Sequence, residues 1–424
     1  MTNQEQLAQI LKKKGIGPES SKSLKNEDIA LLKALMLTSD VSLTTKATLL
    51  TALLTLEPTD IEKLLINEIQ SNPTDFLPEQ LIPFISGEVS YFQSTINQII
   101  QHQHLTKEVA ETAVQHLFDN TPDYLKGAFL ESERLKRETY EENSAFFKVL
   151  KSHVPSHKAN IKHLIDLGDS YDGCTRTPSL NLFLGATLAA AGYPTILHGV
   201  DTVAPKEGVT HHQILKAAGK NALKPISSVI DDLENKTIGW SYVDQKVYHP
   251  QLYALKQVRK EMVKRPFLAT FEKMLQPIVA DKNYVVSQYT HKHYKLEVAK
   301  LIHEFCSFDK SIHIKGIEGT CMMNPKIPLE CVLIDHSFHE KTIYGEEQGF
   351  KDSLGRYDNI TPDLCLEIGL DILQNKDIPE KNFLIFQGAT LLHYLFEIDF
   401  KTAKNTIETV ISNYSALNHW NNLK

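Results

Sequence analysis

Residues 161–219 alternate twice between a short apolar run, a polar loop and a helical pattern. The run IKHLIDLGD enters the loop SYDGCTRTP and the small-residue helix SLNLFLGATLAAAG, and PTILHGV then enters the loop DTVAPKEGVT and the stretch HHQILKAAG. A crossover helix of this length joins neighbouring parallel strands in a right-handed sense. The segment therefore predicts an α/β fold with a mostly parallel sheet, whose two loops open at the carboxyl edge, where such folds bind ligands.

Local signals predict where the elements of this segment begin and end. Residues 161–167 and 194–198 are expected to be buried strands. Thr177-Pro178 is expected to cap and start the first helix, because threonine accepts a first-turn N–H and proline has none to lose. Gly192 is expected to end that helix, since glycine adopts the left-handed conformation after a last turn.

The two loops carry groups that suit an anion. Exposed N–H groups at a helix start, together with Arg176 and Lys206, would bind phosphate. The alternative is that Asp172, Gly173 and Arg176 only form a tight turn with a solvated charge, because the first loop contains neither GxGxxG nor GxxxxGK[ST]. The presence of two such loops in one unit favours the phosphate site.

Composition limits the class of protein. The chain has 424 residues, 42% of them hydrophobic, and a net charge of −7, so binding to nucleic acid or an anionic membrane would need a local basic patch. Five scattered cysteines without a CxxC pattern argue against disulfides and zinc ribbons. The polar N-terminus lacks a signal-peptide core, and the most apolar stretch, residues 182–198, is interrupted by Gly and Pro. We therefore expect a cytoplasmic protein without a membrane span.

Residues 1–150 are expected to form an all-helical domain. Asn26 precedes apolar residues at helical spacing, and Thr59 with Glu62 forms a capping-box signature. LTSDVS at 37–42 and ISGEVS at 85–90 each introduce a similar helical pattern, which suggests a duplicated helical pair. Residues 120–150 are predicted to be one long charged helix whose solvated face is held by ion pairs.

A larger α/β domain is expected over 160–245 and 279–424, with further strands at 284–286, 312–314 and 331–334 and terminal helices at 361–374 and 379–417. Residues 246–278 are predicted to be helical and to return to the N-terminal domain, so that they form part of the wall of an interdomain cleft. Lys256, Arg259, Lys260 and Lys264 recur at three- and four-residue steps and predict one basic helical face. That face either binds a ligand or is simply solvated; both interpretations stay open.

Histidine clusters invite a metal site but lack matched ligands. They are His211-His212, His291-Lys292-His293 and the segment DHSFH at 335–339, and each is expected to be an exposed loop. No nucleophile-elbow pattern appears. Glu318, in a Gly-Ile-Glu-Gly turn, is a candidate general acid or carboxylate ligand. No catalytic residue is assigned.

The order of these segments resembles the anthranilate phosphoribosyltransferase family, which shares its fold with the pyrimidine nucleoside phosphorylases. LTSDVS and ISGEVS resemble segments of the family's N-terminal domain. The stretch YDGCTRTPSLNLFLGATLAAAG resembles the family's GTGGDG loop and the Ala-rich helix after it, and LHGV resembles the family's KHGN motif. PKEG resembles the family's SSKSG loop, and YHPQLYALKQVRKEMVKRP resembles the hinge that carries the acceptor-binding arginine. IKGIEGTCMMN resembles the family's HGEDGLDE turn. The resemblance implies a helical domain, an α/β domain and a homodimer.

The resemblance also implies site residues. Phosphoribosyl pyrophosphate (PRPP) or a similar phosphorylated ligand is expected to contact the matching loop residues, which are Asp172, Gly173, Thr175, Arg176, His198, Gly199, Lys206 and Gly208. Arg259 matches the acceptor arginine, with Arg265 on the same side.

Two departures separate the chain from the family pattern. Ser170 and Tyr171 replace the paired glycines of the PRPP loop and are expected to crowd the approach of pyrophosphate. Cys321 and Met322 replace the acidic pair that holds Mg²⁺, and Mg²⁺ requires hard oxygen ligands. Mg²⁺ remains the one cofactor that the resemblance implies, with no metal ligand assigned.

Two functions follow. The first is a phosphoribosyltransferase-like enzyme with an unassigned nitrogenous acceptor, in which the standard anthranilate activity is weak or lost. The second is a non-catalytic paralogue that binds nucleic acid or a nucleotide through a basic cleft, as the divergent branch with YDGxTR and GxEG is regarded as doing.

Overall fold

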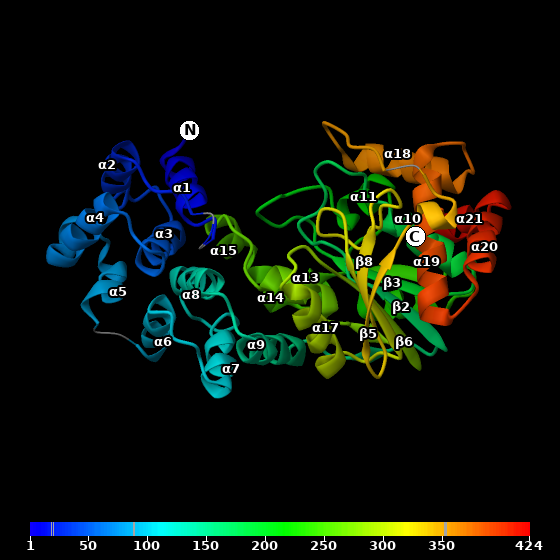
Figure 1. Ribbon diagram of the computed structural model, residues 1–424, viewed down its shortest axis with the longest axis horizontal. Helices are drawn as coiled ribbons and strands as arrows, with labels where there is room; N and C mark the ends of the chain where they lie inside the picture. The colour runs from blue at the N-terminus through cyan, green and yellow to red at the C-terminus, as the bar shows by residue number, and fades with distance from the viewer. Residues whose placement is uncertain (18, 20, 88–89, 352–353) are drawn as a thin grey trace. The chain divides into compact units, whose positions relative to one another are not determined.

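The computed structural model describes residues 1–17, 19, 21–87, 90–351 and 354–424. The chain divides into two compact units (Figure 1). The first comprises residues 1–150 and 254–268, and the second comprises 151–253 and 269–424. The described residues contain no helix long and apolar enough to cross a membrane.

The first unit is helical. Its helices are α1 (Asn3–Lys14), α2 (Asn26–Leu35), α3 (Leu43–Thr55), α4 (Asp60–Ser71), α5 (Pro83–Ser86), α6 (Tyr91–Ile100), α7 (Lys107–Gln115), α8 (Asp123–Lys136) and α9 (Tyr140–Ser152), with short 3₁₀ turns at Pro73–Asp75 and Glu79–Leu81. The later helix α15 (Lys256–Glu261) contacts α3 and α8, so the chain returns to this unit after entering the second (Figure 1).

Three predicted helix starts are confirmed by their hydrogen bonds. The Glu62 side chain accepts the Thr59 N–H at 2.9 Å, which is the Glu arm of the capping box. Ser42 caps α3 and Ser90 caps α6 through the opposite arm, since each serine side chain accepts the N–H three residues later. The two repeat phrases therefore end on equivalent caps, although residues 88–89 of ISGEVS lie outside the described residues.

The prediction of one solvated helix over 120–150 is wrong. The chain breaks between α8 and α9 at Arg137, whose φ is +70°. The charged side chains on these helices are largely internal: Glu133 and Glu142 are fully buried, and Lys136 is paired with both. The ion pairs exist, but they lie inside the unit because apolar residues on both sides of the helix also pack.

The second unit is built on a mixed seven-stranded sheet in the order β4-β3-β2-β6-β7-β8-β9. Its strands are β2 (His163–Leu167), β3 (Thr195–Gly199), β4 (Trp240–Asp244), β6 (Lys282–Tyr289), β7 (Lys310–Lys315), β8 (Leu329–Ile334) and β9 (Phe338–Ile343), while β1 (His157–Lys158) and β5 (Ile278–Val279) form a separate parallel pair. The strands from β4 to β7 are parallel, and β8 and β9 are antiparallel. The predicted fold class is confirmed.

Helices complete the second unit and its core. They are α10 (Asn181–Ala190), α11 (His211–Ala217), α12 (Ile226–Glu234), α13 (Gln245–Tyr248), α14 (Pro250–Ala254), α16 (Leu268–Phe271), α17 (Tyr294–Phe305), α18 (Pro362–Leu373), α19 (Pro379–Phe396), α20 (Phe400–Ser412) and α21 (Ser415–Asn422), with 3₁₀ turns at Glu272–Met274 and Glu346–Gln348. The small-residue helix α10 contacts α18 to α21 as well as β3 and β4, and all of these contribute to one apolar core.

Three local expectations need correction. Helix α10 begins at Asn181, three residues after Pro178, and its N-cap is Leu180, not Thr177. Of the predicted helical return at 246–278, only 254–268 clusters with the first unit. Strands β4 and β9 were not predicted from the sequence. All residues of β4 are buried and nearly all of β9 are exposed, so neither strand alternates between buried and exposed residues with a period of two. Gly192 does follow α10 in the left-handed region, with φ +91°.

Candidate functional site

The two predicted loops are joined into one structure. Cys174 and Val209 form an antiparallel bridge, with N–H to O distances of 3.0 and 2.8 Å, and the Gly208 N–H donates to the Asp172 carbonyl at 2.9 Å. The loops approach so closely that a Cβ on Gly173 would lie 2.6 Å from the Gly208 carbonyl carbon, and one on Gly208 would lie 2.5 Å from the Cys174 oxygen. Only glycine fits at either position.

A third segment closes on these loops from the end of β7. Residues 316–320 form a turn in which the Thr320 N–H donates to the Ile317 carbonyl at 2.8 Å. Glu318 and Gly319 both have left-handed backbones, with φ of +52° and +82°. The conformation is costly for glutamate, and residues held this way are concentrated at functional sites.

The Glu318 carboxylate is held by the first loop. Its Oε2 accepts the Thr175 N–H at 3.0 Å and the Thr175 hydroxyl at 3.3 Å, and its Oε1 accepts the Arg176 N–H at 3.0 Å. The Arg176 Nε lies 3.7 Å from Oε1, and Lys206 Nζ lies 4.0 Å from Oε2. We call these donors, the amides of Thr175 and Arg176 with the side chains of Arg176 and Lys206, the amide cradle.

The cradle stabilises negative charge. Burial by itself would raise the pKa of the Glu318 carboxyl, but hydrogen bonds from Thr175 and Thr177 and the charges of Lys206 and Arg176 outweigh it, so the pKa is lowered. The bound group is therefore a carboxylate anion at neutral pH. A phosphate oxygen would find the same donors.

The second cation is balanced by a second carboxylate. Lys206 Nζ donates to the Glu318 carbonyl at 2.8 Å and lies 3.4 Å from Asp172 Oδ1, which also accepts the Ser170 hydroxyl at 2.6 Å. Two cations thus face two carboxylates. The structure therefore brings together Asp172, Gly173, Thr175, Arg176, Lys206 and Gly208 of the predicted residues, and adds Ser170 and Glu318.

His198 and Gly199 lie in the interior next to the loops, not in the cradle. The Tyr171 hydroxyl forms two hydrogen bonds of 2.5 Å, one with His198 Nδ1 and one with the Tyr248 hydroxyl. His198 Nε2 in turn lies 2.8 Å from Asp166 Oδ1. Tyr171 is only 1% exposed. Tyr171 packs with Val200 and Val203 in a small apolar cluster. Ser170 instead lies near the Glu318 turn, since a Cβ on Gly319 would lie 3.6 Å from the Ser170 hydroxyl.

Cys321 and Met322, which the sequence resemblance places where the family holds Mg²⁺, do not fit that ion. Cys321 and Met322 are fully buried, and the Cys321 thiol donates to the Gly168 carbonyl at 3.0 Å. Burial raises the pKa of this thiol well above its usual range, so it stays protonated. Nowhere in the described part of the chain do three or more His, Cys, Asp or Glu side chains gather as metal ligands would.

The buried space near Cys321 is instead organised by Asp169. Its carboxylate accepts the Cys321 N–H at 2.9 Å and the Asn181 amide at 2.7 Å, and lies 3.0 Å from His211 Nε2. The expectation that His211 and His212 are exposed loop residues is wrong: they begin α11, His211 is 6% exposed, and His212 Nδ1 contacts Asp244 at 2.8 Å. Sequence proximity could not reveal these acidic partners.

The predicted acceptor-side residues belong to the first unit. Helix α15 ends at Glu261, so Lys264 and Arg265 lie beyond it. Arg259 is 1% exposed, and Lys264 Nζ donates to the Lys12 carbonyl at 2.9 Å. The predicted continuous basic helical face is therefore wrong, because the helix is short and its central arginine is buried.

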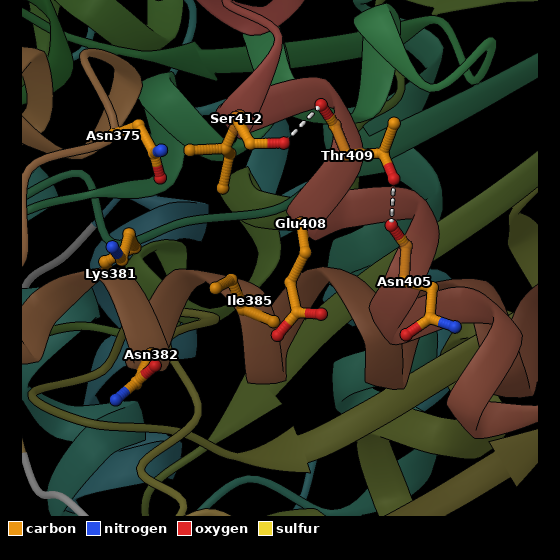
Figure 2. A pocket seen from close by; sticks show the side chains of 9 residues that line it. Asn375, Lys381, Asn382, Ile385, Asn405, Glu408, Thr409 and Ser412 are labelled. Atoms are coloured by element: carbon orange, nitrogen blue, oxygen red, sulfur yellow. Dashed lines mark hydrogen bonds between the residues drawn. The ribbon is translucent and has the colours of Figure 1, made fainter.

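A polar pocket of about 370 Å³ lies on the second unit between α19 and α20 (Figure 2), and none of the cradle residues lines it. Asparagine, Lys381 and Glu408 side chains surround it. Two of its hydroxyls bond within α20, since Thr409 donates to the Asn405 carbonyl at 2.7 Å and Ser412 to the Thr409 carbonyl at 3.1 Å. These bonds are ordinary helix back-bonds and do not create a ligand site.

Known proteins resemble the chain in sequence. Residues 93–154, which span α6 to α9, match the helical bundle domain of the glycosyl transferase family. An uncharacterized protein of Aquifex aeolicus is 32% identical over 224 residues, and an anthranilate phosphoribosyltransferase of Halobacterium salinarum is 26% identical over 197. These alignments cover 51% and 46% of this chain and span 64% and 56% of the two relatives.

The fold is shared with solved anthranilate phosphoribosyltransferases. The Thermus thermophilus enzyme aligns with a TM-score of 0.61 at 15% identity, covering 77% of this chain and 98% of that one. The Saccharomyces cerevisiae enzyme in complex with PRPP and Mg aligns at 0.62 and 13% identity, covering 78% and 96%. The chain is therefore similar in sequence to anthranilate phosphoribosyltransferases over about half of its length and shares their fold, and residues 93–154 match the helical bundle domain of the glycosyl transferase family.

Proposed function

We propose that the chain binds a phosphorylated ribose of the PRPP type through the amide cradle, and that any turnover transfers the phosphoribosyl group to a nitrogenous acceptor other than anthranilate. The observation that carries the proposal is the Glu318 carboxylate, held by two consecutive backbone amides beside Arg176 and Lys206. Such donors form charge-assisted hydrogen bonds with phosphate as they do with carboxylate.

The position of the cradle supports the same ligand class. Its loops follow the parallel strands β2 and β3, and the Glu318 turn follows β7, so all three segments leave carboxyl ends of the sheet. Open α/β sheets bind ligands at that edge. The S. cerevisiae relative with the same fold binds PRPP together with Mg.

The chemistry of the site argues that phosphoribosyl transfer is slow. In phosphoribosyl transfer the bond from ribose C1 to the pyrophosphate oxygen breaks as the acceptor nitrogen bonds to C1, and pyrophosphate leaves with its electron pair. Stabilising that leaving charge is normally a large part of catalysis. Buried Cys321 and Met322 offer no hard oxygen ligands, so Arg176 and Lys206 are the groups that would bear this charge.

The expected homodimer and the acceptor side at Arg259 and Arg265 are part of this proposal. The nucleic-acid alternative has less support, because the buried Arg259 and the short α15 remove the basic face on which it rested.

Calorimetric titration with pyrophosphate and with PRPP, each with and without Mg²⁺, tests the proposal. Binding of both ligands, with little dependence on Mg²⁺, is expected. If neither ligand binds at millimolar concentration, the proposed function is wrong.

A further inference from the structure

The Glu318 side chain occupies the donors that a ligand phosphate would need. Both amides of the cradle donate to its oxygens at 3.0 Å. Its side chain is 4% exposed, whereas the Arg176 side chain is 60% exposed. The carboxylate is therefore the buried partner of this ion pair, and it occupies the two backbone amides of the cradle.

We propose that Glu318 is an internal competitor for the phosphate site, which must swing away before the cradle accepts a phosphate, and that it thereby sets which anions the protein binds. The inference rests on the proposed function, since it concerns the same cradle. A weakly charged anion cannot replace the carboxylate, whereas a ligand with a di- or trianionic group offers more charge to the same donors.

Charge in the site supports displacement rather than joint binding. With Glu318 in place, Arg176 and Lys206 are balanced by Glu318 and Asp172. A phosphate beside Glu318 would face a like charge within a few ångströms, and this repulsion is stronger at a protein surface than in bulk water because the effective dielectric is lower. With Glu318 turned away, the cations are available to the ligand.

The turn itself is fixed, so the movable part is the side chain. Lys206 holds the Glu318 carbonyl at 2.8 Å, and Lys273 Nζ lies 3.3 Å from the Gly319 carbonyl. Within the turn, the Thr320 hydroxyl donates to the Ile317 carbonyl at 2.6 Å, and the Ile317 N–H donates to the Met322 carbonyl at 3.1 Å. Rotation about the side-chain torsions of Glu318 releases the amides without moving this backbone.

The simpler interpretation is that Glu318 only latches the first loop to the turn. The two roles differ in the sign of one measurement. Removing a latch loosens the loop and weakens phosphate binding, whereas removing a competitor strengthens it.

The test uses the full chain and inorganic pyrophosphate as the probe, with affinity measured by calorimetry. Glu318→Gln keeps the side-chain shape and removes the charge; Glu318→Gly removes the side chain at a φ of +52° that glycine adopts freely. Both variants are expected to bind at least about tenfold more tightly than the parent, because a like charge near the ligand is gone. Circular dichroism and thermal melting establish that each is folded.

Glu397→Gln is the matched control. Glu397 is also a glutamate with a left-handed backbone, at φ +59°, and its ion pair with Lys310 lies at the start of β7, opposite the end that leads to Glu318. Glu397→Gln changes the net charge of the protein by the same amount as Glu318→Gln and should leave pyrophosphate affinity unchanged. An equal gain in this control would mean a general charge effect and would overturn the inference.

The remaining outcomes separate the two proposals. If the parent binds pyrophosphate and both Glu318 variants bind equally or less well, Glu318 is a latch and the inference fails while the proposed function stands. If neither the parent nor the variants bind, the cradle is not a phosphate site and both fail. Should the variants not fold, ¹⁵N spectra of the parent decide: saturating pyrophosphate must shift the Thr175 and Arg176 amide signals, and unshifted signals overturn the inference.

Discussion

Lys206 and Glu318 meet through both the backbone and the side chain of the glutamate. Lys206 Nζ donates to the Glu318 carbonyl at 2.8 Å and lies 4.0 Å from its Oε2. One lysine thus links the second loop to the turn after β7, and its charge remains next to the anion position. This link makes the cradle a product of three separate segments.

Loss of either cradle cation should weaken phosphate binding. Arg176→Ala and Lys206→Ala are each expected to lower pyrophosphate affinity roughly ten- to a hundredfold, because a charge-assisted hydrogen bond contributes on the order of 1.5–3 kcal/mol. Calorimetric titration measures the effect. Lys376→Ala, which removes the exposed partner of Asp371, is the control and should change nothing. Unchanged affinity in both cradle variants would contradict the site assignment.

Mg²⁺ should add little to ligand binding or turnover. Cys321 and Met322 are buried and offer sulfur where Mg²⁺ needs oxygen. Phosphoribosyl transfer to anthranilate is therefore expected to be absent or very weak, both without Mg²⁺ and at millimolar Mg²⁺. A Mg²⁺-dependent turnover of about 1–10³ s⁻¹ in a fluorescence assay of anthranilate consumption would refute this.

The first unit should depend strongly on Glu62. Its carboxylate accepts Lys14 Nζ at 2.8 Å and the Leu24 N–H at 3.0 Å, and both members of the ion pair are at most 2% exposed. Glu62→Gln is expected to cost about 3–5 kcal/mol in the free energy of unfolding, because Lys14 stays buried without its counter-charge.

Urea denaturation measures that loss. Glu68→Gln, on the same helix, removes the exposed partner of Lys33 and should cost about 0–1 kcal/mol. Equal losses of unfolding free energy in the two variants would show that burial does not determine how much the ion pair between Lys14 and Glu62 contributes to stability.

His313 should make stability fall with acid. Burial lowers the pKa of this imidazole on β7 from 6.5 to about 3, and its Nδ1 contacts the Ser287 hydroxyl at 2.7 Å. Between pH 6.5 and 3 the unfolded chain binds a proton that the folded protein does not, so this group's contribution to stability decreases as pH falls through that window. Its slope approaches about 1.4 kcal/mol per pH unit.

Unfolding free energies at pH 7 and pH 5 test this. His313→Asn should lower stability at pH 7 but flatten the difference between the two pH values, because asparagine does not titrate. A variant with the full pH dependence of the parent would assign that dependence to other groups.

A homodimer is still expected, but the apolar residues of the first two helices, which were predicted to form its contact, face the interior of the unit. Leu7, Ile10 and Leu32 on these helices are buried within the unit, but Leu37 after α2 remains 50% exposed. Exposed apolar residues on one surface form isologous contacts in C₂ dimers. Sedimentation velocity at micromolar concentration should give a dimer, and Leu37→Asp should shift it toward monomer. A monomeric parent would contradict the prediction.

The sequence predicted elements where local chemistry decides structure. Gly192 after α10 and Glu62 in its capping box depend on residues within a few positions, and both appear as expected. Predictions failed where packing outweighed local signals. Pro178 does not start α10, and the charged stretch around Glu133 is internal, because burial depends on what the rest of the chain brings to that surface.

The amino-acid sequence by itself determined the mostly parallel α/β unit, the two loops at the carboxyl edge of its sheet and the sulfur-containing side chains of Cys321 and Met322. Only the tertiary structure decided that the Glu318 carboxylate lies on the Arg176 amide, 142 residues away, and that Asp169 lies beside His211. The physical reason is range. Helix, strand and turn preferences act over a few residues, whereas a carboxylate takes whichever donors the finished sheet places within about 3 Å.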